Sequence, residues 1–200
     1  MIIYGLILGD GFLQKTGKKN ARLRIEHSLK QKEYLDWLYQ SLRNLFASEP
    51  KMINRQHPQT KQIYHYCRLQ SHSSPFFGKL RREFYLNNKK IIPENIEKLL
   101  LHRLTLAIWY MDDGYYYQRD KSAHIYLPMM DDLSRKRLLN CLNKNFRLSA
   151  KIYCRPDRLA CQLNFTGSDK DKLFVLIRPY TLPIFSYKLH SNPVSTKSEK

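Results

Sequence analysis

The sequence is short of acidic residues and has no long hydrophobic run. Only 17 Asp and Glu residues stand against 35 Lys and Arg residues among 200, which leaves a formal net charge of +18. No apolar run approaches the ~20 residues that a bilayer span needs. The apolar start MIIYGLILGDG is shorter than that and lacks a preceding basic segment, so we do not expect a signal peptide. With 42% apolar residues, the composition excludes both a disordered and a membrane-like chain.

Cysteine and histidine patterns of metal-binding proteins are also missing. The four cysteines lie at irregular spacings and form no CxxC pair: Cys67, Cys141, Cys154 and Cys161. We therefore expect reduced thiols in an intracellular protein rather than a disulfide framework or a zinc site. The seven histidines show no HxH or HExxH spacing, so the sequence supports no zinc prediction.

The excess of positive charge favours a polyanionic partner, and nucleic acid is the leading candidate. Basic residues are spread along the whole chain rather than gathered on one amphipathic helix. This distribution argues against binding to an anionic membrane surface.

The chain repeats itself. Residues 3–14 read IYGLILGDGFLQ and residues 106–118 read LAIWYMDDGYYYQ, and in each segment an aspartate and a glycine end an apolar stretch. These aspartates are Asp10 and Asp113. The hydrophobic periodicity that follows predicts the order α-β-β-α-β-β-α twice. In the first copy we expect strands near 11–15, 21–27, 51–56 and 62–70 and helices at 30–46 and 75–85. In the second we expect helices at 134–146, with Ser134 as N-cap, and 168–178, with strands near 150–155 and 158–165.

These patterns divide the chain into two halves, 1–93 and 104–190, joined by residues 94–103 and followed by a polar tail, 191–200. The segments 2–9 and 104–111 are apolar nearly all round, as buried helices are. Gly5 and Gly9 share one helix face and would let two helices approach closely. If the helices lie parallel, Asp10 and Asp113 meet at one end.

Two adjacent carboxylates repel each other unless a cation lies between them. Oxygen ligands favour a hard divalent ion, most simply Mg²⁺ (or Mn²⁺). A metal held beside a basic surface is what phosphodiester hydrolysis requires. The residues therefore point to a metal-dependent nuclease, with a purely structural role for the Asp-Gly pairs as the alternative.

The motifs YGLILGDG and LAIWYMDDG resemble those of the LAGLIDADG homing endonuclease family, in its monomeric two-motif branch. Supporting segments are KQKEYLDWLY, NNKKIIP and the PY-x-x-P run that ends in YKL. The resemblance implies an α+β fold in which two αββαββα halves form a saddle. Each half would lay a four-stranded antiparallel sheet into the major groove of double-stranded DNA. It also implies staggered double-strand cleavage at a long site and intron homing by an intron-encoded enzyme.

The resemblance also assigns site residues. Asp10 and Asp113 match the metal-binding motif aspartates, and Gly9 and Asp112 lie where backbone carbonyls complete the metal shell. Lys90 and Lys188 match the lysines near each active centre. One departure concerns a strand position where relatives often carry glutamine. The first half offers Glu26 and the second offers Met129 and Met130, which would slow cleavage of one strand or mark a loss of nuclease activity.

Basic and amide residues of the expected strands and hairpins form the candidate DNA-binding surface. Arg and Gln pair with guanine and adenine in the major groove. The candidates are Lys18, Lys19, Arg22, Arg24, Arg55, Arg68, Gln70, Lys151, Arg155, Arg158 and Gln162.

Two other functions fit the same saddle. One is an RNA-binding maturase that helps its host intron fold, and the other is a catalytically inactive DNA-binding protein. The host compartment stays open among a bacterial cytoplasm, a mitochondrion and a plastid. We expect a monomer, because one chain carries both halves.

Overall fold

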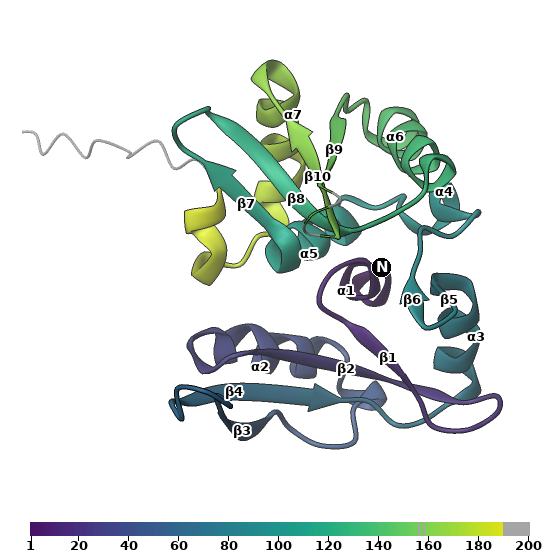
Figure 1. The fold of residues 1–200 in the computed structure, drawn as a ribbon, viewed down its shortest axis with the longest axis vertical. Helices are drawn as coiled ribbons and strands as arrows, with labels where there is room; N and C mark the ends of the chain where they lie inside the picture. Colours follow the sequence, from purple (N-terminus) through teal and green to yellow (C-terminus); the bar gives the residue numbers. More distant parts are fainter. Residues whose placement is uncertain (156, 158, 190–200) are drawn as a thin grey trace, which may run out of the picture.

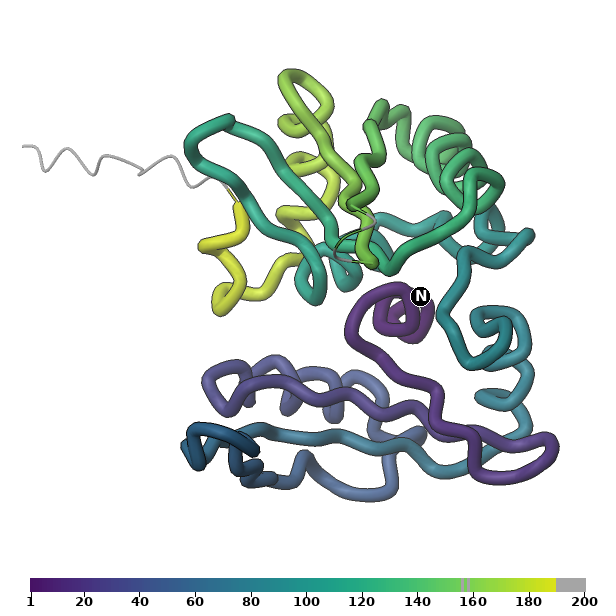
Figure 2. Tube along the Cα trace, in the orientation of Figure 1, coloured from purple at the N-terminus to yellow at the C-terminus, as the bar shows by residue number. Residues whose placement is uncertain are grey.

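The computed structural model describes residues 1–155, 157 and 159–189. Arg158 and the expected polar tail thus lie outside the described residues. The chain forms two similar layered units with two helices between them, as Figures 1 and 2 show. No helix among the described residues is both long and apolar enough to span a bilayer.

The element order confirms the duplication. The first half contains α1 (Ile2–Leu8), β1 (Phe12–Lys15), β2 (Ala21–Ser28), α2 (Lys32–Ser41), β3 (Lys51–Gln56), β4 (Ile63–Gln70), α3 (Pro75–Phe84), β5 (Tyr85–Leu86) and β6 (Lys89–Lys90). After α4 (Ile96–Leu99), the second half contains α5 (Arg103–Asp113), β7 (Gly114–Tyr117), β8 (Ser122–Pro128), α6 (Asp132–Phe146), β9 (Lys151–Arg155), β10 (Ala160–Phe165) and α7 (Gly167–Ile177). The antiparallel sheets have matching orders, β1-β2-β4-β3 and β7-β8-β10-β9.

Strand alternation gives each sheet a buried face and an open face. On β2, Leu23, Ile25 and His27 are buried, whereas Arg22 and Arg24 lie on the opposite, partly exposed side. Helices α2 and α3 pack against the first sheet, and α7 packs against the second. The open faces therefore carry the polar residues available to a partner.

Helices α1 and α5 lie side by side (Figure 1). They run in the same direction, as the sequence predicts, because Gly5 lies against Ile108 and Gly9 against Asp112. A Cβ on Gly5 would lie 2.6 Å from the Ile108 Cβ, and a Cβ on Gly9 would lie 2.5 Å from the Asp112 Cβ. Both distances are shorter than real carbon contacts, so glycine is required at these crossing points. The close approach aligns the C-terminal ends of the two helices.

Several local expectations need correction. The predicted helix 30–46 is shorter, because 3-10 turns at Leu29–Gln31 and Arg43–Leu45 flank α2. Ser134 is not an N-cap: the Asp131 carboxylate caps α6 by accepting from the Ser134 backbone N–H at 2.7 Å. Residues 85–90 form an unexpected hairpin of β5 and β6, whose turn residues Asn87 and Asn88 both have positive φ.

The expectation of four reduced thiols is wrong for one pair. Cys154 and Cys161 form a disulfide, whereas Cys67 and Cys141 are free and buried. The cause is the β9–β10 register, which places Cys154 directly opposite Cys161. Neighbouring strands bring such opposed side chains within bonding reach.

Candidate active site at the seam between the halves

The C-terminal ends of α1 and α5 meet at the boundary between the two halves, which we call the seam. This meeting brings the two motif aspartates close together. Asp10 follows the last turn of α1, and Asp113 is the last residue of α5. Across the seam, the Asp10 backbone N–H donates to Asp112 Oδ2 at 3.1 Å. The structure thus gathers the carboxyl groups of Asp10, Asp112 and Asp113 at one end of the helix pair.

A lysine binds the end of each motif helix, at the places that the sequence predicts. Lys90, from β6, donates to the Gly9 carbonyl at 2.6 Å and to the Gly11 carbonyl at 3.2 Å. Lys188 donates to the Met111 carbonyl at 2.6 Å and to the Asp112 carbonyl at 2.9 Å. Carbonyls at a helix C-terminus carry negative partial charge and attract such cations.

The ionisable groups of this site are largely buried, and burial shifts their pKa values. Burial and, to a smaller extent, the Asp10 carboxylate raise the pKa of Asp113 to about 7, against the lowering effect of Lys90 and Lys188. Burial also lowers the pKa of Lys90 and of Lys188, while the neighbouring aspartates favour their charged forms. Asp113 therefore binds a proton more readily than an ordinary aspartate, mainly because burial disfavours its charged form.

The donor set suits a hard divalent cation. Asp10 and Asp113 supply carboxylate oxygens, and the raised pKa of Asp113 marks a place where added positive charge is favourable. The Gly9 and Asp112 carbonyls each accept a hydrogen bond from a lysine. A carbonyl oxygen has two lone pairs, so it can bind a second group. The residues that the resemblance assigns to Mg²⁺ therefore fit such an ion chemically, while their ligand roles stay predictions.

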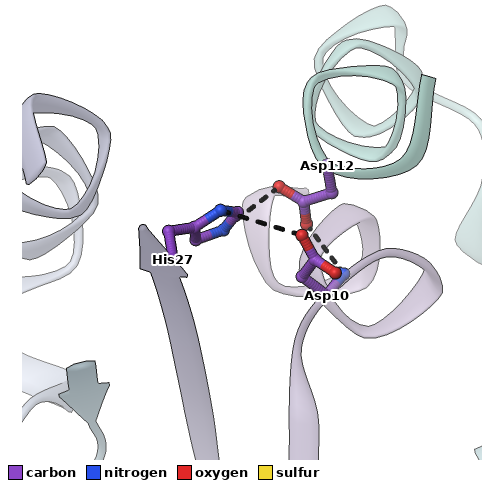
Figure 3. Close-up of side chains that lie close together, drawn as sticks. All are labelled: Asp10, His27 and Asp112. Atoms are coloured by element: carbon purple, nitrogen blue, oxygen red, sulfur yellow. Dashed lines mark hydrogen bonds and ion pairs between the residues drawn. The ribbon is translucent and has the colours of Figure 1, made fainter. Parts of the chain in front are cut away.

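Sequence reasoning missed three side chains here. The Asp112 carboxyl is fully buried, and the Tyr34 hydroxyl donates a hydrogen bond to its Oδ1 at 2.8 Å. Burial and the Asp10 carboxylate raise the pKa of Asp112 well above its usual value. His27, at the end of β2, faces both acids (Figure 3). Its Nδ1 lies 3.7 Å from Asp10 Oδ2 and its Nε2 lies 3.9 Å from Asp112 Oδ1. The alternation of Leu23, Ile25 and His27 was the signal that places His27 on the buried face.

The open face of the first sheet carries most of the predicted DNA-binding arginines. Arg22 and Arg24 lie on it, and the β2–β4 register places Gln70 beside Arg24. Glu26 pairs with Arg55 at 2.5 Å and with Arg68 at 2.8 Å. Glu26 is thus the counter-ion of two candidate DNA-binding residues.

The open face of the second sheet is mainly aromatic. Tyr115 stacks on Tyr126 with ring centroids 5.0 Å apart and on His124 at 4.9 Å. Gln162 contacts His124 on this face, and the candidates Lys151 and Arg155 lie on the edge strand β9. These candidates share a face, but their binding to DNA stays a prediction.

The suggested match of Met129 and Met130 to Glu26 is wrong. On β2, Glu26 follows Ile25, which pairs with Leu69 of β4. On β8, Tyr126 follows Ile125, which pairs with Leu163 of β10. The register therefore equates Glu26 with Tyr126. Met129 follows the end of β8, where the Cys161 Sγ lies 3.8 Å from its sulfur.

Lys18 and Lys19 lie on the exposed β1–β2 hairpin, as expected. With Lys15, Arg81 and Arg82 they line a hollow between this hairpin and α3. No acidic side chain lines the hollow among the described residues, so it presents only positive charge.

The family model of the LAGLIDADG DNA endonuclease family matches residues 1–173. The fold and the paired motifs thus define the class of protein, and the chain belongs to this family. A relative described as probable intron-encoded endonuclease 1, from Wickerhamomyces canadensis, is 26% identical over 195 residues, covering 95% of this chain and 83% of that protein.

Other relatives carry different names. Cytochrome b mRNA maturase bI2 from Debaryomyces hansenii is 26% identical, with 94% of this chain and 72% of that protein covered. Protein RecA from Mycolicibacterium flavescens is 28% identical, and the match covers 94% of this chain but only 45% of that protein. Among solved structures, the homing endonuclease I-WcaI bound to its DNA recognition sequence matches with a TM-score of 0.84 and 26% identity, covering 96% of this chain and 85% of that one.

Proposed function

We propose that this protein is a divalent-metal-dependent endonuclease that cuts double-stranded DNA at a long, specific site and serves the homing of a mobile intron. The observation that carries the proposal is that the C-terminal ends of the two motif helices, which we call the motif ends, are built alike. At the first, Lys90 binds the carbonyl that precedes Asp10. At the second, Lys188 binds the carbonyl that precedes Asp113. The similarity to a DNA-bound homing endonuclease over 96% of the chain supports it.

Asp10 and Asp113 would hold Mg²⁺ or Mn²⁺ with help from the Gly9 and Asp112 carbonyls. Such an ion, when bound, supplies a polarised water and stabilises the departing oxygen. Lys90 and Lys188 fix the motif ends and place positive charge where negative charge grows on the phosphate. The two open sheet faces would bind the duplex on either side of the seam.

One chain supplies both motif ends, so we propose that it acts as a monomer with halves at 1–93 and 104–190 and a join at 94–103. A homing enzyme acts where its intron resides, in a bacterial cytoplasm or an organelle. Sequence specificity would come from the open faces, and phosphate contacts from the hairpin lysines.

The test begins with a randomised duplex library, from which cleaved sites are selected with the wild-type protein and Mg²⁺. Asp10→Asn and Asp113→Asn should then bind the selected site with wild-type affinity but cut neither strand detectably. Chelation of the metal should stop cleavage by the wild type. Normal cutting by either variant would show that the active site lies elsewhere.

The maturase is the second candidate, because a relative matched over 94% of the chain carries that name. It predicts tight binding to the host intron RNA and faster splicing, both independent of Asp10 and Asp113. Measuring splicing of that intron with wild type and Asp113→Asn separates the two functions. Splicing help that survives the substitution, without DNA cleavage by the wild type, would favour the maturase.

A further inference from the structure

His27 presents an unused nitrogen lone pair inside the seam. Its side chain is 5% exposed, and its Nδ1 lies 3.0 Å from the Gln31 amide oxygen. An amide oxygen only accepts hydrogen bonds, so this contact fixes the hydrogen on Nδ1. Nε2 then carries the free lone pair, and it has no hydrogen-bond partner among the described residues.

That lone pair faces the Asp112 carboxyl, and the Asp10 carboxyl lies beside the same ring, with its Oδ2 3.7 Å from Nδ1. Asp112 Oδ1 lies 3.9 Å from Nε2, too far for a hydrogen bond. Asp10 completes the group, and one ligand atom from each of the three residues lies within 4.8 Å of the others. Figure 3 shows the three side chains converging from β2, α5 and the end of α1. Asp10 is 43% exposed at its side chain, which leaves a route for an ion from solvent.

We propose that His27, Asp112 and Asp10 form a binding site for a borderline-soft transition ion such as Zn²⁺, separate from the hard-cation site between Asp10 and Asp113. Imidazole nitrogen suits Zn²⁺, whereas Mg²⁺ prefers oxygen ligands only. Three protein ligands with an open fourth position are typical of catalytic zinc sites, whereas structural zinc sites have four. The bond from Nδ1 to Gln31 is the supporting contact that zinc-binding histidines usually make.

The two sites share Asp10, so they compete. A Zn²⁺ ion held by His27 and Asp112 turns the Asp10 carboxylate toward the inner site and withdraws it from Asp113. The binding is independent of the proposed nuclease function, and only the competition rests on it. Zinc would therefore inhibit Mg²⁺-supported cleavage.

The second half supplies the matched variant. His27 pairs with Cys67 across β2 and β4, and Leu127 pairs with Cys161 across β8 and β10. Leucine thus occupies the corresponding place in the second half, and His27→Leu transfers it to the first. The histidine His65, exposed on β4, provides the control His65→Gln.

Zinc affinity is measured by competition with a chromophoric chelator on the full chain. Wild type should bind one Zn²⁺ that His27→Leu binds at least about 100-fold more weakly, and Gln31→Ala should cost about tenfold. His65→Gln and Asp113→Asn should keep wild-type zinc affinity. His27→Gln provides a second ligand deletion if leucine prevents folding, which a thermal melt without metal reveals.

Unchanged zinc affinity in the folded His27 variants would overturn the proposal. Equal losses in Asp113→Asn and His27→Leu would also overturn it, because the ion would then lie between the motif aspartates.

In the cleavage assay, Zn²⁺ should inhibit wild type at concentrations that leave His27→Gln unaffected. Zinc binding that depends on His27 but leaves wild-type cleavage unchanged would contradict the sharing of Asp10. A wild type that binds zinc but never cuts would contradict the nuclease function alone.

Discussion

At matching places, the first half carries Gly9 and His27 where the second half carries Asp112 and Leu127. Gly9 leaves the space into which the Asp112 carboxyl fits, and His27 and Tyr34 surround that carboxyl from the first half. The backbone plan is duplicated, but the buried polar groups are not. Duplication therefore places two equivalent motif ends together, whereas one-sided substitutions give the seam its distinct chemistry.

The open faces differ in the same way. The first sheet offers arginines, of which Arg55 and Arg68 pair with Glu26. The second offers stacked tyrosines around Tyr115 and Tyr126. Arginines act mainly through charge and directional hydrogen bonds, whereas tyrosines act through apolar contact. We expect the first sheet to contribute more of the salt-dependent affinity for nucleic acid.

The largest effect is expected on stability, from a substitution of Gly9, where α1 crosses α5. In Gly9→Ala the added methyl would lie 2.5 Å from the Asp112 side chain, so the helices must separate. We expect a loss of about 3 kcal/mol in the free energy of unfolding, since overpacking costs 1–3 kcal/mol and sometimes more. Chemical denaturation measures it. Gly17→Ala, where no atom lies within 4 Å of the new methyl, is the control and should change stability little.

The lysines test whether the two motif ends act alike. Lys90→Met and Lys188→Met should each lower the cleavage rate of the selected site about 10²-fold, the scale for losing one charge-stabilising donor. Lys89→Met is the control, because only Lys90 of this pair binds the motif end. Rates for each DNA strand, measured with end-labelled duplexes, show whether each lysine serves one strand. A wild-type rate in either variant would remove that lysine from the site.

The pH dependence of metal binding tests the role of Asp113. Because Asp113 has a pKa of about 7, a bound proton blocks its carboxylate at pH 6 and is mostly released at pH 8. A metal ion must displace that proton, so apparent Mn²⁺ affinity should rise about tenfold between pH 6 and pH 8. Titration calorimetry at both pH values measures this. Asp113→Asn should flatten the dependence, and an equally steep dependence in that variant would contradict the assignment.

The smallest effect is expected on the salt dependence of nucleic-acid binding by the open sheet faces. Glu26→Gln frees Arg55 and Arg68, so the plot of log affinity against log salt should steepen by about one unit and low-salt binding should tighten. Tyr126→Leu, at the matching place in the second sheet, should leave the slope unchanged while weakening affinity. An equal change of slope in both variants would show that the faces do not divide the work this way.

The features predicted well from the sequence are those with a local pattern or a match to the family motifs. The paired motifs repeat, Gly5 and Gly9 share one helix face, and the resemblance assigns the two lysines; the structure places all of them at the helix pair or its end. The sequence predicted a role for the Asp112 carbonyl, but not for the Asp112 carboxyl or for His27, because their meeting depends on the crossing of α1 and α5 and on the end of β2 reaching the same point. The Cys154–Cys161 disulfide depends on a strand register that spacing alone leaves open. Duplication is visible in a sequence, whereas contacts between unlike residues of the two halves are not.

The most direct test of the account is a crystal of the protein with its selected DNA and Mn²⁺, measured at a wavelength where manganese scatters anomalously. The account predicts anomalous density at the ends of α1 and α5, in contact with both Asp10 and Asp113. Manganese bound elsewhere on the complex, with these two carboxylates free of it, would contradict the central claim.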